Sequence, residues 1–317
     1  MSSIHSEASP DDPPYAPPDS SRLPPTTRPG PVRLQIADLS RSLAWYGDVL
    51  GMRALDFGPG WARLGAEGEA PGPHLVELVE RPGAAPVPRR GHLGLYHAAL
   101  LLPDRPDLGR FVGHLARLRI PAGSADHLVS EALYLNDPDG LGFEVYADRP
   151  AEAWARTPTG EIAMASDPLA LDDLIRAGGD TPWSGLPPGT RIGHLHLHVG
   201  ELRVAEAFYA EALGLDVQVR SYPGALFLSA GGYHHHLGVN TWAHGAGPAG
   251  PNDARLLSWS LELPHPEPVE AALVRLEGAG HAVTRPEAGV GRVRDPWGTE
   301  LRILSLPGGA STSAPPI

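Results

Sequence analysis

The chain has 317 residues, of which 42% are hydrophobic, so it is long enough for roughly two domains with substantial cores, and a small disulfide-stapled scaffold is excluded. It contains no cysteine, which excludes disulfides, thiolate metal sites and cysteine nucleophiles and leaves His, Asp and Glu as the strong metal ligands. With 25 basic and 37 acidic residues the formal charge is −12, which argues against nucleic acid or anionic membrane as a partner and favours a small molecule.

Both ends of the chain are predicted to lie outside the fold. Residues 1–30 are rich in proline, serine and aspartate and carry too little apolar surface to offset the entropy of ordering, so we expect a disordered leader. Residues 307–317 are expected to form a loose tail. The sequence has neither a long apolar run nor the basic and apolar regions of a secretory signal, and we therefore expect no membrane partner and a cytoplasmic location.

A repeated pattern divides the rest of the chain into four similar units. Residues 38–50 and 201–213 both predict a short amphipathic helix that opens on an acidic residue and ends at a glycine. Asp-Pro-x-Gly turns at 137–140 and 295–298 each lead into a strand. Each unit combines a short strand, a helix and several further strands, which indicates an α+β fold. The units begin near Val32, Gly94, Gly193 and Leu256.

This arrangement resembles the vicinal oxygen chelate superfamily, which comprises glyoxalases, extradiol dioxygenases and resistance proteins. The resemblance implies four βαβββ modules that pair into half-barrels able to hold a metal. Four modules in one chain resemble in particular the extradiol ring-cleaving dioxygenases of the catechol-2,3-dioxygenase type. The resemblance implies a first module pair in residues 31–148, a linker in 149–190 and a second module pair in 191–306.

Three histidines share one face of a predicted strand. In residues 193–199, His194, His196 and His198 alternate with apolar side chains, so all three point to the same side of the sheet. The pattern indicates a ligand or active-site role for at least one of them, and the alternative is a solvated or hydrogen-bonded strand surface. His97 opens the second module in the same manner as His194 opens the third.

Residues 127–144 resemble the extradiol dioxygenase signature, in which a histidine, a tyrosine, an acidic-Pro-x-Gly turn and a glutamate follow one another at this spacing. The resemblance implies that Glu144 is the carboxylate metal ligand and that His127 and Tyr134 contact the substrate. The alternatives are an exposed strand acid for Glu144 and a packing role for Tyr134.

A run of three histidines at 234–236 resembles the family segment that carries an acid–base catalyst. The resemblance assigns that role to His235, and the alternative is a surface metal scavenger or a solvated turn. In an extended chain His234 and His236 project to the side opposite His235, so the register decides which side chain points into the site.

The metal ligands are complete in one pairing of modules. In the usual four-module dioxygenase the metal lies between the third and fourth modules, but here the fourth opens without a histidine and has Arg302 where the second has Glu144. Glu300 lies two residues before Arg302, the position that matches Glu144. Pairing the second module with the third assembles His97, His194 and Glu144. We therefore predict that these two modules pair and that the first and fourth form a metal-free companion.

Two histidines and one carboxylate suit Fe(II), with Mn(II) as the alternative, and leave neighbouring coordination positions open. The resemblance implies an Fe(II)-dependent extradiol dioxygenase that opens a catechol-type aromatic diol with dioxygen, while His235 exchanges a proton with the substrate. The identity of the diol stays open, as does a homo-oligomeric state.

Two further functions stay open. A glyoxalase-like lyase or isomerase would use Ni(II) or Zn(II) as a Lewis acid and draw on Glu77, in a pairing of the first two modules that lacks one ligand because the first module opens at Pro31. A metal-free binding protein of the resistance type would line an aromatic pocket with tryptophans, although these are more often core residues. The candidates are Trp45, Trp61, Trp183 and Trp259.

Overall fold

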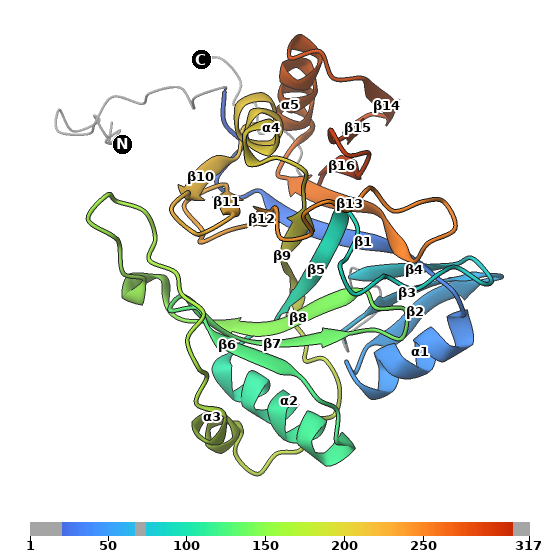
Figure 1. Cartoon of the computed structure of the whole chain (residues 1–317), viewed down its shortest axis with the longest axis vertical. Coiled ribbons are helices and arrows are strands. Elements are labelled where there is room, and N and C mark those ends of the chain that lie inside the picture. The colour runs from blue at the N-terminus through green and yellow to red at the C-terminus, as the bar shows by residue number, and fades with distance from the viewer. Residues whose placement is uncertain (1–20, 67–73, 307–317) are drawn as a thin grey trace, which may run out of the picture.

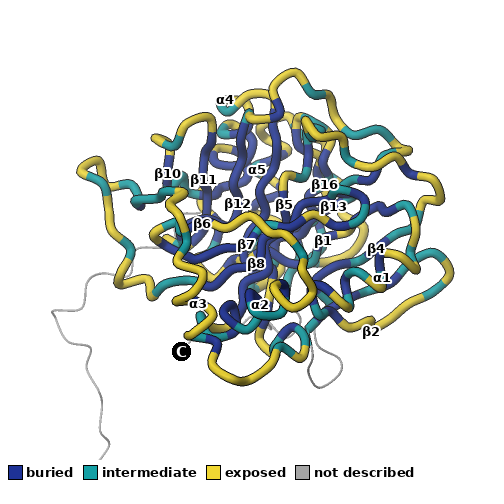
Figure 2. Tube along the Cα trace, turned by 60° about the horizontal axis from the view of Figure 1, so that its bottom comes forward, coloured by how far each residue is buried: buried dark blue, intermediate teal, exposed yellow. Residues whose placement is uncertain are grey.

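The computed structural model describes residues 21–66 and 74–306, and these form two eight-stranded sheets with helices on their outer faces (Figure 1). Buried residues follow the strands of both sheets, and exposed residues lie mostly in the loops and on the helices (Figure 2). The α+β fold of βαβββ modules is therefore confirmed. None of the helices in the described ranges is both long and apolar enough to span a membrane.

The first sheet combines the first and fourth modules in the order β14-β15-β16-β13-β1-β4-β3-β2. Its strands are β1 (Arg28–Ile36), β2 (Arg53–Gly58), β3 (Trp61–Gly65), β4 (Val76–Glu80), β13 (Arg255–Leu263), β14 (Val283–Glu287), β15 (Val290–Arg294) and β16 (Glu300–Ser305). The two modules meet where β1 and β13 run antiparallel.

The second sheet combines the second and third modules in the order β10-β11-β12-β9-β5-β8-β7-β6. Its strands are β5 (Gly94–Leu101), β6 (Gly123–Asp126), β7 (Ser130–Asn136), β8 (Gly142–Asp148), β9 (Arg191–His198), β10 (Asp216–Val219), β11 (Ala225–Ser229) and β12 (Leu237–Asn240). The predicted pairing of these modules is confirmed, because β5 and β9 are antiparallel neighbours. Residues 31–148 and 191–306 each contribute strands to both sheets, and the division of the chain at these residues stays a prediction.

The helices cover the outer faces of the sheets. They are α1 (Leu39–Asp48), α2 (Arg105–Leu118), α3 (Leu171–Gly178), α4 (Leu202–Glu206), which continues as the π-helical turn Ala207–Ala212, and α5 (Pro266–Gly278). Both helices predicted from the repeat are present. Asp38 caps α1 by accepting a hydrogen bond from the backbone of Arg41, whereas Glu201 makes no such bond at α4.

The predicted linker, residues 149–190, is built into the fold. It contains a short 3₁₀ turn (Ala151–Ala153) and α3, which packs on α2. The two helices cross so closely that a Cβ on Gly109 would lie 2.1 Å from the carbonyl oxygen of Leu174. Ile162 joins a small core with Val129. The predicted linker therefore packs against α2 and the second sheet.

The prediction of a disordered leader over residues 1–30 is wrong for the part that the structure describes. Leu23 is buried, its backbone N–H donates to the carbonyl of Gly214, and β1 begins at Arg28. The guanidinium of Arg22 donates to the carbonyl of Leu215. One buried leucine and these backbone contacts hold the segment to the third module. Residues 1–20 and the predicted tail 307–317 lie outside the described residues.

One buried contact occurs twice and ties the two sheets together. The Tyr46 hydroxyl of α1 donates to Asp137 in the turn before β8, and the Tyr209 hydroxyl donates to Asp295 in the turn before β16, at 3.1 and 2.7 Å. Each aspartate also accepts backbone N–H groups of its own turn. Burial raises the pKa of Asp137 to about 6. The Asp-Pro-x-Gly turns thus join modules as well as starting strands.

Tyr46→Phe should lower the free energy of unfolding by about 1–3 kcal/mol, because it leaves the buried Asp137 carboxylate one donor short. Tyr209→Phe should cost a similar amount. The matched control is Tyr222→Phe, which removes a hydroxyl that contacts Ser166 in an exposed position and should cost less than about 0.5 kcal/mol. Urea denaturation measures all three. Equal stability of Tyr46→Phe and the wild type would contradict the role of this contact.

Candidate metal centre

Three adjacent strands bring His97, Glu144 and His194 to one face of the second sheet. Ala99 on β5 is in register with Glu144 on β8 and with His194 on β9, so these three side chains stand in a row. His97 precedes Ala99 by two residues and points to the same face. The carboxylate and the two imidazoles therefore come together on this face of the sheet.

The ligand atoms of these three residues lie close together. Nε2 of His97 lies 3.0 Å, and Nε2 of His194 3.1 Å, from Oε2 of Glu144. Each of the three residues offers one ligand atom, and these three atoms lie within 4.8 Å of one another. All three side chains are buried. Although Nε2 of His97 lies 3.0 Å from Oε2 of Glu144, the two are not aligned as a hydrogen bond, and a buried nitrogen without an aligned partner is unfavourable unless it binds something. Two nitrogens and one oxygen aimed at one point fit a divalent cation.

The electrostatics of the group also favour a cation. Burial alone would raise the pKa of Glu144, but His194 and His97 outweigh it and hold that pKa well below its usual value. Burial lowers the pKa of His194 to about 4, although Glu144 partly opposes the shift. At neutral pH the group therefore offers one carboxylate and a neutral imidazole, which are the forms that bind metal. The exposed-acid alternative for Glu144 is wrong.

A cavity of about 150 Å³ adjoins the three ligands. A cavity of about this volume in another protein accommodates benzene, so the space suits a single aromatic ring. Its lining includes all six residues singled out from the sequence: His97, His127, Tyr134, Glu144, His194 and His235. The lining also includes His196, which the sequence offered as one of three candidate histidines on its strand. The lining residues that the sequence did not single out for this site are Tyr96, Ala125, Met164, Ser166, Tyr222, Phe227 and Trp242. Met164 and Ser166 come from the predicted linker, and sequence pattern alone gave no signal for them.

His127 and Tyr134 form a hydrogen-bonded pair at the cavity wall. Nδ1 of His127 lies 2.6 Å from the carbonyl oxygen of Ala165, and Nε2 contacts the Tyr134 hydroxyl. A carbonyl can only accept, so Nδ1 carries the proton and the Tyr134 hydroxyl donates to Nε2. Tyr134 also packs beside Ala132, in register with Glu144 across β7 and β8. The packing role and the cavity contact therefore coexist.

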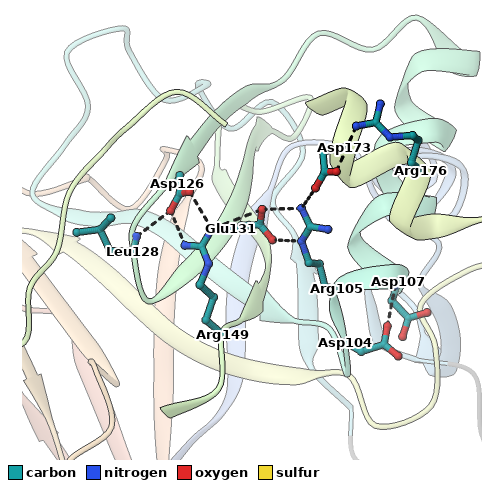
Figure 3. A network of polar contacts seen from close by, with 9 residues as sticks. All are labelled: Asp104, Arg105, Asp107, Asp126, Leu128, Glu131, Arg149, Asp173 and Arg176. Carbon is teal, nitrogen blue, oxygen red and sulfur yellow. Dashed lines mark hydrogen bonds and ion pairs between the residues drawn. The ribbon is translucent and has the colours of Figure 1, made fainter. Parts of the chain in front are cut away.

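A network of charged residues fixes the turn that carries His127 (Figure 3). Asp126 accepts hydrogen bonds from the backbone of Leu128, which has a φ of 68°, and from Arg149. Arg149 also lies 3.6 Å from Glu131, and Arg105 of α2 joins that glutamate to α3. The helices thereby hold the β6–β7 turn and the His127 ring in place.

The three histidines at 234–236 are buried, so the solvated-turn alternative is wrong. His235 lines the cavity, and its ring centroid lies 4.1 Å from that of His194. Nε2 of His234 lies 2.8 Å from Oδ1 of Asp148. Nδ1 of His236 accepts a hydrogen bond from the backbone of Ala230. Of the three, His235 is the one at the cavity.

The histidines of β9 are also buried, which excludes a solvated strand surface. They differ in their contacts. His194 reaches Glu144, His196 lines the cavity, and His198 is hydrogen-bonded to Asn240 at 2.7 Å. The hydrogen-bonded alternative therefore describes His198.

The first sheet lacks a comparable group. Glu77 is held by Arg33 and Arg63 at 2.7 and 3.1 Å, and Glu300 pairs with Arg294 at 3.0 Å. Within residues 21–66 and 74–306 no second cluster of three His, Asp or Glu ligands occurs. Likewise, the four tryptophans considered for an aromatic pocket do not line the metal-side cavity. They are Trp45, Trp61, Trp183 and Trp259.

Comparisons with known proteins agree with this architecture. The family model of the Glyoxalase/Bleomycin resistance protein/Dioxygenase superfamily matches residues 28–145 and 191–303, and the chain belongs to this superfamily. The chain is 43% identical over 270 residues to a catechol-2,3-dioxygenase of Bacillus subtilis (strain 168), covering 84% of this chain and 93% of that protein.

Solved structures show the same fold at low identity. A protein from Bacillus subtilis subsp. subtilis str. 168 has a TM-score of 0.61 at 15% identity, over 90% of this chain and 86% of that chain. Glyoxalase I from Zea mays has a TM-score of 0.51 at 17% identity, over 88% of this chain and 92% of that chain.

Glu144→Ala should abolish stoichiometric metal binding, because it removes the one anionic ligand of the group. Since loss of groups that merely orient ligands weakens metal binding about 10- to 100-fold, loss of the ligand itself should weaken it at least as much. Glu300→Ala, which alters a glutamate paired with Arg294 in the first sheet, should retain the metal. Elemental analysis after anaerobic loading with Fe(II) measures both. Metal loss in Glu300→Ala and retention in Glu144→Ala would reverse the assignment.

The buried histidines predict an acid-sensitive fold. Burial, with neighbouring histidines, lowers the pKa of His236 from 6.5 to about 3. Between these pH values the unfolded chain binds a proton that the folded chain does not, so stability falls as pH falls through this window. His236→Asn removes this effect and keeps an acceptor for Ala230. From about pH 7 to about pH 5 the wild type should lose more free energy of unfolding than the variant. Parallel profiles in urea denaturation would refute this.

Proposed function

We propose that the protein is an extradiol ring-cleaving dioxygenase that opens a catechol-type aromatic diol with dioxygen at a non-haem Fe(II) site, with Mn(II) as the alternative metal. The observation that carries the proposal is the buried group of His97, Glu144 and His194 beside a cavity of about 150 Å³, the size of one ring. The 43% identity to a protein named catechol-2,3-dioxygenase supports the same activity. A cytoplasmic location, a homo-oligomeric state and the absence of nucleic-acid and membrane partners stay predictions.

The three ligands would hold the metal on one side and leave neighbouring positions for other ligands. Bound there, Fe(II) would supply a template for the two vicinal oxygens of the diol and a route for electrons from the ring to dioxygen. His97, Glu144 and His194 are all nearly inaccessible to solvent, so the reacting groups meet in a site that excludes most water.

Aromatic side chains of the third module position the ring of the diol. Phe227 packs edge-on against His235 with ring centroids 4.9 Å apart, and Trp242 lies 5.4 Å from the ring of His196. Tyr222 packs edge-on against Phe227 and completes this wall. Aromatic rings prefer offset or edge-to-face contacts at such distances, which a single substrate ring would extend.

Two groups exchange protons and hydrogen bonds with the diol. Burial and the neighbouring histidines lower the pKa of His235 well below its usual value, so its imidazole is neutral at pH 7 and can accept a proton from a diol hydroxyl. Burial, with the charge of Glu144, raises the pKa of Tyr134 well above 10 and keeps its hydroxyl protonated. Because that proton is donated to His127, the Tyr134 oxygen can accept a hydrogen bond from the substrate.

The role of Glu77 in the glyoxalase-like alternative draws no support from the site. Glu77 lies in the first sheet, where Arg33 and Arg63 bind both of its carboxylate oxygens. It is not among the residues that line the cavity beside the candidate metal ligands. A base or ligand role in this cavity is therefore not available to it.

A dioxygen electrode tests the proposal directly. Protein loaded anaerobically with Fe(II) should consume one dioxygen per diol when given catechol or its methyl- or carboxyl-substituted derivatives, with a yellow ring-cleavage product. Glu144→Ala should show no uptake, whereas Glu300→Ala should retain it. Metal-loaded wild type that consumes no dioxygen with any of these diols would overturn the proposal, and isomerisation of a thiohemiacetal without dioxygen would favour the lyase.

A further inference from the structure

The run of histidines contains a series of hydrogen bonds that the chemistry above does not use. Nε2 of His234 lies 2.8 Å from Oδ1 of Asp148, and Nδ1 of His234 lies 2.8 Å from Nδ1 of His235. His234 is fully buried, whereas the side chain of Asp148 is 23% exposed at the end of β8. The hydrogen bonds thus connect the Asp148 carboxylate at the edge of the site, through the His234 imidazole, to the His235 imidazole at the cavity.

Hydrogen-bond chemistry assigns the protons along this series. The Asp148 carboxylate can only accept, so His234 donates from Nε2. When this is the only ring proton of His234, its Nδ1 has a lone pair, which accepts from Nδ1–H of His235. The Nε2 atom of His235 is consequently left without a proton. A base in the cavity needs this tautomer, because its free lone pair must face the substrate.

Packing holds the two intermediate groups in this arrangement. The Tyr233 ring lies against His234 in a tilted contact with ring centroids 4.0 Å apart, and Trp154 packs edge-on against His234 at 5.1 Å. The Tyr233 hydroxyl donates to Oδ2 of Asp148 at 2.9 Å, which orients the carboxylate so that Oδ1 faces His234. The His234 ring therefore has little freedom to rotate away from either partner.

We infer that Asp148 and His234 are positioning residues that hold His235 with Nδ1 protonated and with Nε2 free to accept a proton inside the cavity. The inference rests on the proposed function, in which His235 exchanges a proton with the diol. The arrangement performs the task of the aspartate in a Ser-His-Asp triad, which fixes the tautomer and orientation of a catalytic imidazole, with one further imidazole in between. It also accounts for the histidine that precedes His235 in the sequence.

Kinetics of two variants test this role. His234→Gln keeps an amide near Asp148 but loses the contact with His235, and Asp148→Asn places an amide where the carboxylate accepts. Both should lower kcat for ring cleavage about 10- to 100-fold, with KM for the diol and metal content unchanged. The matched control is His236→Asn. His236 lies in the same run of histidines but is not part of these hydrogen bonds, so this variant should keep kcat within about twofold. Unchanged kcat in both variants, or a raised KM with intact kcat, would overturn the inference.

A second measurement does not depend on activity or on the folding of the two kinetic variants. In full-length protein labelled with ¹⁵N-histidine, studied with and without diamagnetic Zn(II), two-bond ¹⁵N–¹H correlations report which nitrogen of His235 carries the proton. The wild type should show the Nδ1–H tautomer, assigned by comparison with His235→Gln. An Nε2–H tautomer in the wild type would overturn the inference. Failure of the wild type to cleave any diol would instead count against the proposed function and leave this test in force.

Discussion

The alignment of β5 between β8 and β9 is the constraint on which the site depends. Ala99 is in register with Glu144 on one side and His194 on the other, and a shift of one residue in either ladder would turn a ligand to the opposite face. Alternation fixes this register, because Leu195 and Leu197 of β9 must enter the core while His194 and His196 face the cavity. The apolar positions that stabilise the sheet thus also determine where the metal ligands lie.

The two sheets share an architecture but differ in chemistry. In the register of the first sheet, Ser258 and Arg302 occupy the positions that His97 and Glu144 occupy in the second. The first sheet therefore supports the second, through the buried tyrosine–aspartate contacts of the turns, and carries no ligand group of its own among the described residues. Polar atoms buried at the site, such as Nε2 of His97, which has no aligned hydrogen-bond partner, work against stability, as is common at functional sites.

Local pattern explains how much of the site could be predicted. The alternation around His194 predicts its face, and the absence of ligands in the fourth module predicts the pairing of the second and third, since a metal site must be complete. Contacts that depend on tertiary packing could not be found in this way. Met164 reaches the cavity from an irregular segment with no periodicity, and Asp148 meets His234 across a sheet from a distant part of the sequence. Leu23 shows the same limit, because this one buried leucine and its backbone contact with Gly214 hold a segment that has the composition of a leader.

The location of the bound metal tests the central claim most directly. Crystals of the anaerobically prepared, metal-loaded protein would give an anomalous difference map with data collected at the absorption edge of iron or manganese. The account predicts one strong peak within bonding distance of His97, Glu144 and His194, on the cavity side of the second sheet. A peak on the first sheet, or no peak near these three residues in crystals that contain stoichiometric metal, would contradict it.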